Sequence, residues 1–289
     1  MITSLRKLTA VAALSAVALV GCGQQNASDQ PRKGASDPVA ANGPNAIKPP
    51  AVTPVYRRAP VPDESDEESE ETEETEPLVA LTFDADMTAD QGRRAMSGER
   101  FDNPDLVQTL RTLKVPATIF MTGRWAEEYP DQAKEIGTDP LFEIGNHSYS
   151  HYGFTANCHD LPTVSKGRML ADVKRADAAI RRTGARNIVP YFRFPGGCFD
   201  KTSLKAIAPA GKTAVQWDVV SGDAFANYAD AVVEQVMEDV TPGSVVVLHL
   251  TRSAAPVTEA AIEQIVPELR DQGYRLVKVS DLMKAAKKK

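Results

Sequence analysis

The sequence predicts a parallel α/β domain, which leaves a choice between an open doubly wound sheet and a barrel. Two observations predict this class: apolar runs of strand length alternate with helical periodicity after Pro77, and no internal repeat is evident. A third observation favours the barrel. Residue types that carry chemistry follow several of the apolar runs, and parallel barrels collect their active sites at the C-terminal ends of their strands.

Seven apolar runs have the length and the residue types of strands. They start directly after Pro77 and continue almost to the end of the chain. The predicted strands are Leu78–Phe83, Ala117–Met121, Phe142–Gly145, Val189–Phe194, Thr213–Val219, Ser244–Leu250 and Arg275–Val279.

Helices are expected between these strands. The segment from Asp105 to Lys114 follows Pro104, which suits the first turn of a helix, and it places four apolar residues on one face. A longer helix is expected from Thr163 to Thr183. It ends at Gly184, a residue type that commonly terminates helices.

Residues 1–22 have the features of a secretory signal. Arg6 and Lys7 precede an apolar run from Leu8 to Val20, which is short for a membrane span. Cys22 resembles the lipid-carrying cysteine of the bacterial lipoprotein processing site, which implies a mature chain anchored by lipid at the extracytoplasmic face of a membrane. An ordinary signal peptide with an incidental cysteine is the alternative, and both interpretations predict an exported protein.

Residues 23–77 are expected to be a disordered, acidic and Pro-rich tether. Ten of the fourteen residues from Asp63 to Glu76 are acidic, and removing those ten acids from the net charge of −6 leaves +4 for the rest of the chain. The basic residues are scattered, so the sequence does not predict nucleic-acid binding. The remaining residues, 78–289, form the predicted catalytic domain, which we expect to be a monomer.

Cys158 and Cys198 are the two cysteines that remain if Cys22 carries lipid. An exported chain meets oxidising conditions, so we expect these two to form a disulfide, with free thiols as the alternative. Each cysteine follows a segment with candidate site residues. The bridge would therefore hold two loops of the site together.

Two acids and two histidines have the pattern of a metal site. Asp84 and Asp86 are two residues apart at the end of a predicted strand, so both carboxylates can face the same side. His147 and His151 are four apart, which brings two imidazoles together on a helical turn or compact loop. Two imidazoles and one carboxylate are the three protein ligands of a catalytic zinc centre. For the acids alone, a structural role as strand end and helix cap is the alternative.

Three further residues follow predicted strands. Arg193 could keep a neighbouring carboxylate ionised through a charge-assisted pair, although it could also belong to an ordinary turn. Asp223 could fix the tautomer of His249 and raise its pKa. The fourth histidine of the chain, His159, is expected at the surface.

Five ordered segments resemble the motifs of the polysaccharide deacetylase family, which is carbohydrate esterase family 4 or the NodB-homology domain. The resemblance extends from about Leu78 to Met283 and implies a distorted (β/α)7 barrel, here preceded by the signal peptide and the disordered linker. The five segments are Leu81–Asp86, Glu143–His151, Arg193–Gly197, Trp217–Asp223 and Leu248–His249. Pro116–Gly123 is also similar to the family's second-strand segment.

The metal ligands that the resemblance implies are Asp86, His147 and His151. They would bind one divalent cation, zinc in the first place, with cobalt or nickel as the alternatives.

The resemblance also implies catalytic roles. Asp84 would be the general base and His249 the general acid, while Arg193 would orient Asp84 and Asp223 would tune His249.

This sequence departs from the family pattern at several positions. Ala85 separates two aspartates that are usually adjacent, although some branches have this spacing. Gly196 stands where many members have an aromatic residue. The fourth motif has Val220 and Ala224 where the family usually has an earlier aspartate and a closing tryptophan, so the acyl pocket needs another wall, for which Phe225 or Val247 is the candidate. Gly196 and Trp217 are the other residues expected to bind substrate.

The expected function is metal-assisted removal of N-acetyl groups from a glycan. Export to a membrane surface favours N-acetylglucosamine or N-acetylmuramic acid of peptidoglycan as the substrate. Chitin oligomers, O-acetyl esters on a polysaccharide and small cyclic amides are alternative substrates. A glycan-binding lipoprotein without turnover is a further alternative.

Overall fold

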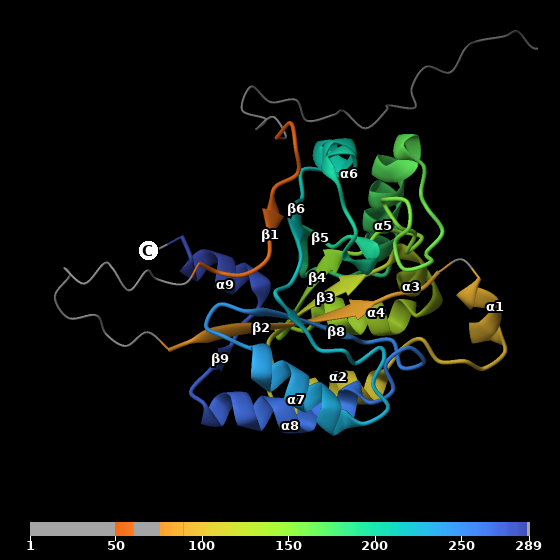
Figure 1. Cartoon of the computed structure of the whole chain (residues 1–289). Coiled ribbons are helices and arrows are strands. Elements are labelled where there is room, and N and C mark those ends of the chain that lie inside the picture. Colours follow the sequence, from red (N-terminus) through yellow and green to blue (C-terminus); the bar gives the residue numbers. More distant parts are fainter. Residues whose placement is uncertain (1–49, 61–75, 89, 288–289) are drawn as a thin grey trace, which may run out of the picture. The chain divides into compact units, whose positions relative to one another are not determined.

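Nine parallel strands form one sheet within residues 50–60, 76–88 and 90–287, which the computed structural model describes (Figure 1). Their order is β1-β6-β5-β4-β3-β2-β8-β7, and β9 pairs with the start of β2. The strands are β1 Val55–Tyr56, β2 Leu78–Ala85, β3 Ala117–Met121, β4 Phe142–Asn146, β5 Ile188–Phe192, β6 Thr213–Val215, β7 Val219–Val220, β8 Val245–His249 and β9 Arg275–Leu276.

A bend in one chain segment closes the sheet into a distorted barrel. The sequence predicts a single strand over Thr213–Val219, but the structure divides it into β6, which pairs with β5, and β7, which pairs with β8. Between them, Gln216 N–H donates to Tyr56 O at 2.8 Å and Asp218 N–H donates to Val245 O at 3.2 Å. The same segment therefore touches both ends of the strand order, which confirms the predicted barrel class.

Residues 50–60 form a strap on the barrel, so the prediction of a disordered tether is wrong for this part of residues 23–77. Within the strap, β1 pairs in parallel with β6, with Val55 opposite Ala214. Beyond β1, Ala59 N–H donates to Gly243 O at 2.8 Å. A two-residue strand among prolines has too few positions to show alternation, so periodicity could not reveal it.

The predicted signal segment 1–22, the predicted lipid site at Cys22 and most of the predicted tether lie outside the described residues. No helix among the residues that are described has both the length and the apolar character needed to cross a bilayer.

Side chains on β2 alternate between two environments, as the period of a strand requires. Val79, Leu81 and Phe83 belong to the large apolar cluster that includes the helices, whereas Thr82 and Asp84 occupy the other face. On that inner face Phe120 of β3 fills the barrel so closely that a Cβ on Gly145 of β4 would come within 2.5 Å of its ring. Because Phe120 is the register partner of Asp84, the barrel interior is packed with side chains at the level of Asp84.

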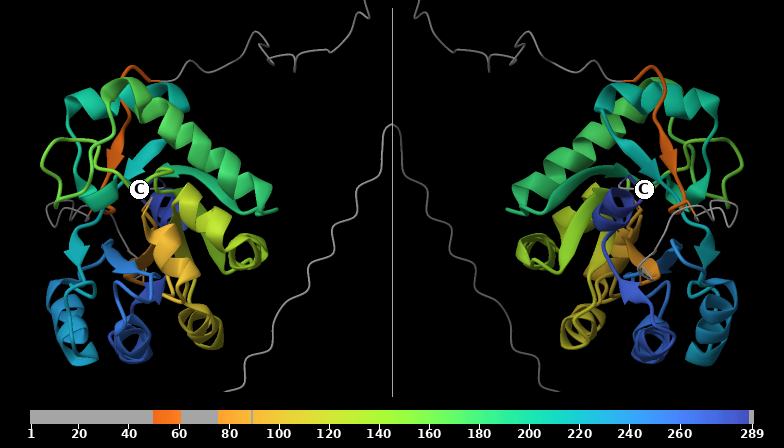
Figure 2. Two further views of the ribbon diagram at one scale, coloured as in Figure 1. Left: turned by 90° about the vertical axis from the view of Figure 1, so that its right-hand side faces the viewer. Right: turned by 90° about the vertical axis from the view of Figure 1, so that its left-hand side faces the viewer.

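Helices surround the strands (Figures 1 and 2), and α2, α7 and α8 lie on one side of the sheet. The α-helices are α1 Gln91–Met96, α2 Pro104–Thr112, α3 Gly123–Glu128, α4 Pro130–Thr138, α5 Met169–Arg182, α6 Lys201–Ile207, α7 Ala229–Asp239, α8 Thr258–Asp271 and α9 Val279–Ala285. The predicted helix at Asp105–Lys114 is confirmed as α2. The helix predicted from Thr163 begins later, because a 3₁₀ turn at Lys166–Arg168 precedes α5.

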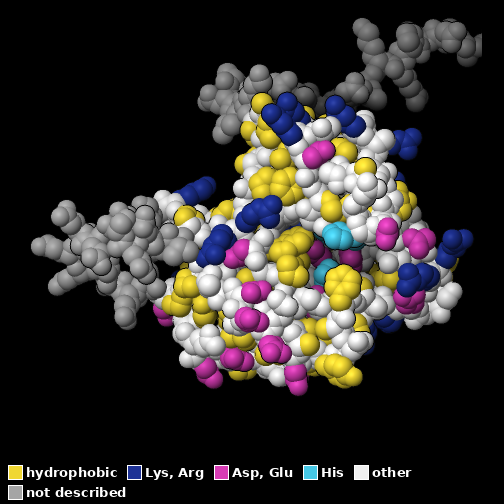
Figure 3. All heavy atoms as spheres, in the orientation of Figure 1, with side chains coloured by type: hydrophobic (Ala, Val, Ile, Leu, Met, Phe, Trp, Pro, Cys, Tyr) yellow, Lys and Arg dark blue, Asp and Glu magenta, His cyan; other side chains and the backbone are white. Residues whose placement is uncertain are grey.

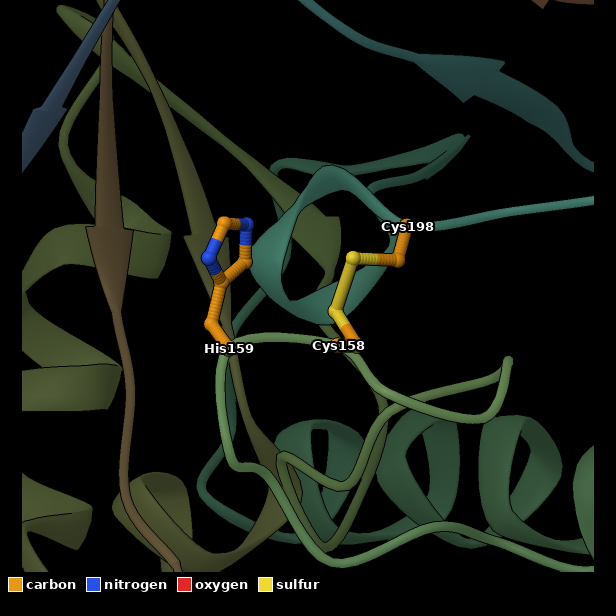
Figure 4. Close-up of side chains that lie close together, drawn as sticks. All are labelled: Cys158, His159 and Cys198. Carbon is orange, nitrogen blue, oxygen red and sulfur yellow. A yellow bond between two sulfur atoms is a disulfide. The ribbon is translucent and has the colours of Figure 1, made fainter.

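The predicted disulfide between Cys158 and Cys198 is present (Figure 4). It joins the loop before α5 to the segment that follows the turn at Pro195–Gly197. The sequence separation of the two cysteines is 40 residues. The bridge therefore connects two loops that leave neighbouring strands, β4 and β5, at the same end of the barrel.

Replacing both cysteines with serine is expected to lower the free energy of unfolding by about 4 kcal/mol, because the bridge restricts the unfolded chain. Urea unfolding of the Cys158→Ser/Cys198→Ser protein against the wild type measures this loss. Wild-type protein treated with a dithiol reductant is the control and should lose a similar amount. A double variant as stable as the oxidised wild type would contradict the expectation.

Candidate metal centre and active site

The predicted site residues converge at the C-terminal ends of four strands. Asp84 is the penultimate residue of β2, and His249 ends β8 directly opposite it in the parallel register. His147 follows β4, and Arg193 follows β5. Because neighbouring parallel strands end on the same side, these residues, distant in sequence, become neighbours at one mouth of the barrel.

The two acids and two histidines form two carboxylate–imidazole pairs. Asp84 Oδ2 lies 3.6 Å from His147 Nε2, and Asp86 Oδ2 lies 3.5 Å from His151 Nε2. The two imidazole rings are 5.0 Å apart between centroids. His147 and His151 sit on a compact loop rather than a helix, and His151 has a positive φ of 55°. Asp86 faces the imidazoles, as a shared metal ion requires.

The chemistry of Asp86, His147 and His151 fits a divalent cation. Burial lowers the pKa of His147 to about 4 and also lowers the pKa of His151, so both imidazoles are neutral, as metal ligands must be. His147 Nδ1 lies 3.0 Å from Arg193 O, which places the ring hydrogen on Nδ1 and leaves Nε2 free to bind a metal. These three residues would hold the ion.

Of the three proposed ligands, Asp86 and His151 form a close pair, whereas the carboxylate next to His147 is that of Asp84. Among the described residues, the group whose three ligand atoms all lie within 4.8 Å of one another is Cys158, His159 and Cys198. Its sulfurs are bonded to each other, so they offer no thiolate to a metal. The Asp86–His147–His151 group, in contrast, offers one carboxylate and two imidazoles, a donor set that would suit a catalytic zinc ion.

A buried ion pair with Arg193 keeps Asp84 ionised. Arg193 Nη1 lies 2.8 Å from Asp84 Oδ1, and the two side chains are 0% and 6% exposed. Burial by itself raises the pKa of Asp84, but the neighbouring cations, Arg193 first, outweigh it and hold that pKa below its ordinary value. The guanidinium also lies 4.0 Å from the centre of the Phe120 ring.

A second pair sets the state of His249. His249 Nδ1 lies 2.8 Å from Asp223 Oδ1, and Asp223 Oδ2 accepts from the His249 N–H at 2.7 Å. Burial by itself lowers the pKa of His249, but the Asp223 carboxylate outweighs it and raises that pKa to about 9. His249 is therefore an imidazolium at neutral pH, and its side chain is 25% exposed.

The residues predicted to contact substrate have different environments. Val247 is buried and lies two residues before His249, so it shares the inner face of β8 and can line the site. Trp217 lies beside Arg193, with 5.3 Å between the guanidinium and the ring centre. Phe225 is 90% exposed on the loop after β7, and its role as a wall of the acyl pocket stays a prediction.

The structure explains why position 196 holds glycine rather than the aromatic residue of the family pattern. Its φ of 62° favours glycine, and a Cβ there would come within 2.7 Å of Cys158 Sγ and 3.1 Å of His159 Cδ2. The disulfide loop thus occupies the space above this turn (Figure 4). His159 is exposed, as the sequence predicts, and lies beside the turn.

The site opens onto the protein surface. Figure 3 shows histidine and acidic side chains in a hollow of this face, with hydrophobic side chains on either side. The side chains of Asp86 and His151 are 17% and 13% exposed. A bulky molecule can therefore approach the pairs without entering a sealed cavity.

The structure adds two supporting residues that the sequence did not single out. Thr258 Oγ1 donates to Asp223 Oδ2 at 2.8 Å from the start of α8. Ser148 Oγ accepts from the His151 N–H at 3.0 Å. Ser148 lies within the histidine segment, so its position could have suggested a role. Thr258 is 35 residues from Asp223, and no local pattern links the two.

A distorted α/β barrel with acids and imidazoles at its strand ends has the architecture of a barrel hydrolase. Residues 71–215 match the family model described as polysaccharide deacetylase, which is about half of the chain. The chain therefore belongs to the polysaccharide deacetylase family. The match includes both aspartates, the two histidines and Arg193, and it ends before Asp223 and His249.

Similar proteins carry related descriptions. A chitooligosaccharide deacetylase of Sinorhizobium fredii is 29% identical over 59% of this chain and 80% of its own length. A peptidoglycan-N-acetylglucosamine deacetylase of Bacillus cereus is 29% identical over 63% and 81%. One similar solved structure is a mutant, with restored activity, of a CE4 family pseudoenzyme from Bacillus anthracis; it has a TM-score of 0.58 and 26% identity, and it covers 72% of this chain and 67% of that chain.

In the metal-free protein, His249 is expected to titrate near pH 9 because of its pairing with Asp223. In Asp223→Asn the pKa should fall toward the ordinary 6.5, because the largest opposition to burial is removed and only the more distant Asp86 and Asp84 still raise it. Imidazole proton shifts followed by NMR against pH measure both values.

The same shift affects stability. The folded-state pKa lies above the unfolded value, so the pair stabilises the fold fully below pH 6.5, and this contribution is lost as the pH rises through about 9. A wild-type His249 that titrates near 6.5 would contradict the assignment.

Proposed function

We propose that this protein is a metal-dependent hydrolase that removes N-acetyl groups from a cell-wall glycan, with N-acetylglucosamine or N-acetylmuramic acid of peptidoglycan as the favoured substrate. Membership of the polysaccharide deacetylase family and the description of the Bacillus cereus relative support this proposal. The description of the Sinorhizobium fredii relative supports chitin oligomers as the alternative substrate. The same groups could also remove O-acetyl groups or hydrolyse small cyclic amides.

The observation that carries the proposal is that two groups beside the imidazoles have complementary protonation states, one able to accept a proton and the other able to donate one. Asp84 is held ionised by Arg193, and His249 is held protonated by Asp223. The two residues face each other across neighbouring strands, since Asp84 and His249 are register partners. Amide hydrolysis needs a base for the attacking water and an acid for the departing amine, and the two environments supply one of each.

Each residue then has a defined task. Asp86, His147 and His151 would hold a divalent cation, which when bound would supply Lewis acidity and lower the pKa of water. Asp84 takes the proton of the attacking water. His249 uses Nδ1 for Asp223, so its Nε2 donates the proton to the departing sugar amine.

Backbone donors would stabilise the tetrahedral oxyanion. In the turn after Arg193, Gly197 N–H donates to Phe194 O at 2.8 Å and Cys198 N–H to Pro195 O at 3.5 Å. Both hydrogens are used inside the turn, so we assign the oxyanion contact to the N–H of Gly196. The positive φ of Gly196 and the disulfide loop packed above it fix the direction of this N–H.

The shape of the site favours a polymer over a small cyclic amide. A polymer needs an open surface, whereas a small amide is best enclosed. The hollow in Figure 3 and the 25% exposure of the His249 side chain fit the first case. Peptidoglycan is favoured because the predicted lipoprotein signal would place the enzyme at the cell wall.

Acetate release from a panel of substrates tests the proposal. Purified protein loaded with zinc is incubated with peptidoglycan, chitin oligomers, O-acetylated xylan and a cyclic amide. We expect acetate from the N-acetylated glycans, with peptidoglycan fastest, and loss of activity after treatment with a chelator. Ring opening of the cyclic amide alone, or tight zinc binding without hydrolysis of any substrate, would refute it.

Asp84→Asn is expected to lower kcat by about 10²–10⁴-fold, because the amide cannot accept the proton of water. Zinc content should remain, since Asp86 and the histidines are unchanged. Thermal unfolding accompanies the assay, because the variant leaves Arg193 buried without its anion. Asp160→Asn is the matched control at an exposed position and should keep full activity. A folded, zinc-loaded and fully active Asp84→Asn protein would eliminate Asp84 as the base.

A further inference from the structure

Thr251 makes three contacts to Asp86 although the two residues are 165 positions apart. Asp86 N–H donates to Thr251 Oγ1 at 3.1 Å, and the Thr251 hydroxyl donates to Asp86 Oδ1. The same hydroxyl lies 3.3 Å from Asp86 O. Thr251 is 1% exposed, so water does not compete with these bonds.

These contacts extend the β2–β8 pairing beyond the ends of both strands. Asp84 and His249 are register partners, and Leu250 N–H donates to Asp84 O at 2.8 Å. In a regular parallel ladder the next bond would run from Asp86 N–H to the carbonyl of Leu250. The side-chain hydroxyl of Thr251 accepts that bond instead. Asp86 is thereby fixed in line with Asp84 on the inner face.

The hydroxyl also selects which oxygen of Asp86 is available. Oδ1 is engaged by Thr251, while Oδ2 lies 3.5 Å from His151 Nε2. A carboxylate held by one oxygen is oriented to bind through the other, and such supporting hydrogen bonds usually strengthen metal binding. No role for a hydroxyl follows from the metal-ligand pattern itself.

We propose that Thr251 is a positioning residue that presents Asp86 Oδ2 to the metal ion, an inference that rests on the metal site of the proposed function. Thr251 lies two residues after His249, which ends β8. The same short segment therefore positions both the metal ligand Asp86 and the proton donor His249. Substitution of Thr251 therefore acts on the affinity for the metal first and on turnover as a consequence.

Zinc titration of the metal-free, full-length protein tests this role independently of any substrate. In Thr251→Val, which keeps the shape and removes the hydroxyl, the dissociation constant for zinc is expected to rise by about 10–100-fold. Thr251→Ser keeps the hydroxyl and should stay within a few-fold of the wild type. The Co²⁺-loaded proteins should show a changed absorption spectrum for valine and an unchanged one for serine.

Thr82→Val is the matched control. Thr82 is also buried on β2 and its hydroxyl also bonds to β8, donating to Val246 O at 2.6 Å, but it does not touch a proposed ligand. It should lose stability without a change in zinc affinity. If both valine variants weaken zinc binding equally, the effect is general loosening of the barrel and the proposal is wrong.

Two further results would overturn the inference. One is a folded Thr251→Val protein that binds zinc as tightly as the wild type; the other is a wild type that binds no zinc. Should the valine variant not fold, Thr251→Ala repeats the test. Hydrogen exchange in the wild type gives an independent measure, since rapid exchange of the Asp86 amide would contradict its bond to Thr251. A protein that shows the zinc effect but releases no acetate would retain this role and lose the proposed function.

Discussion

The buried ion pair between Arg193 and Asp84 is the interaction on which the rest of the site depends. Removing two charges from water costs several kcal/mol per ion, so the pair does not exist for stability alone. The barrel offsets part of this cost through other contacts of Arg193, whose Nε donates to Val215 O and whose guanidinium faces the Phe120 ring. The backbone carbonyl of Arg193 also accepts a hydrogen bond from His147 Nδ1. One residue thus links an ionised carboxylate, a neutral imidazole and the packed interior.

The strap explains why residues outside the predicted domain matter to this pair. Tyr56 of β1 is the register partner of Val215, the residue whose carbonyl accepts from Arg193. Immediately after Val215 the chain bends toward β7, and Gln216 N–H donates to Tyr56 O. Without β1, the edge of β6 and the start of the bend would have unpaired backbone groups. The strap therefore stabilises the barrel at the place where the sheet changes direction and where Arg193 is held.

Local signals in the sequence were sufficient for the barrel class, the disulfide pair and the residues that meet at its mouth. Long apolar runs, a histidine pair at a fixed spacing and acids at a strand end are all properties of neighbouring residues. Contacts that depend on tertiary packing had no such signal, as with Thr258 and Asp223 or the strap and β6. The exposure of Phe225 had no such signal either, because sequence does not show which side of a loop faces the barrel. The bend within Thr213–Val219 was also hidden, since both halves are apolar.

Family membership alone does not establish turnover, because a pseudoenzyme is among the similar structures. The separation of the two aspartates by Ala85 is the departure that could have removed the base or the ligand here. The alternation of side chains along the strand shows that neither acid is displaced from the site. Ala85 packs with the outer apolar cluster, so Asp84 and Asp86 both face inward. Each carboxylate reaches its own imidazole, at 3.6 and 3.5 Å. The spacing therefore preserves one acid beside Arg193 and one beside Thr251, and the two environments give the acids different tasks.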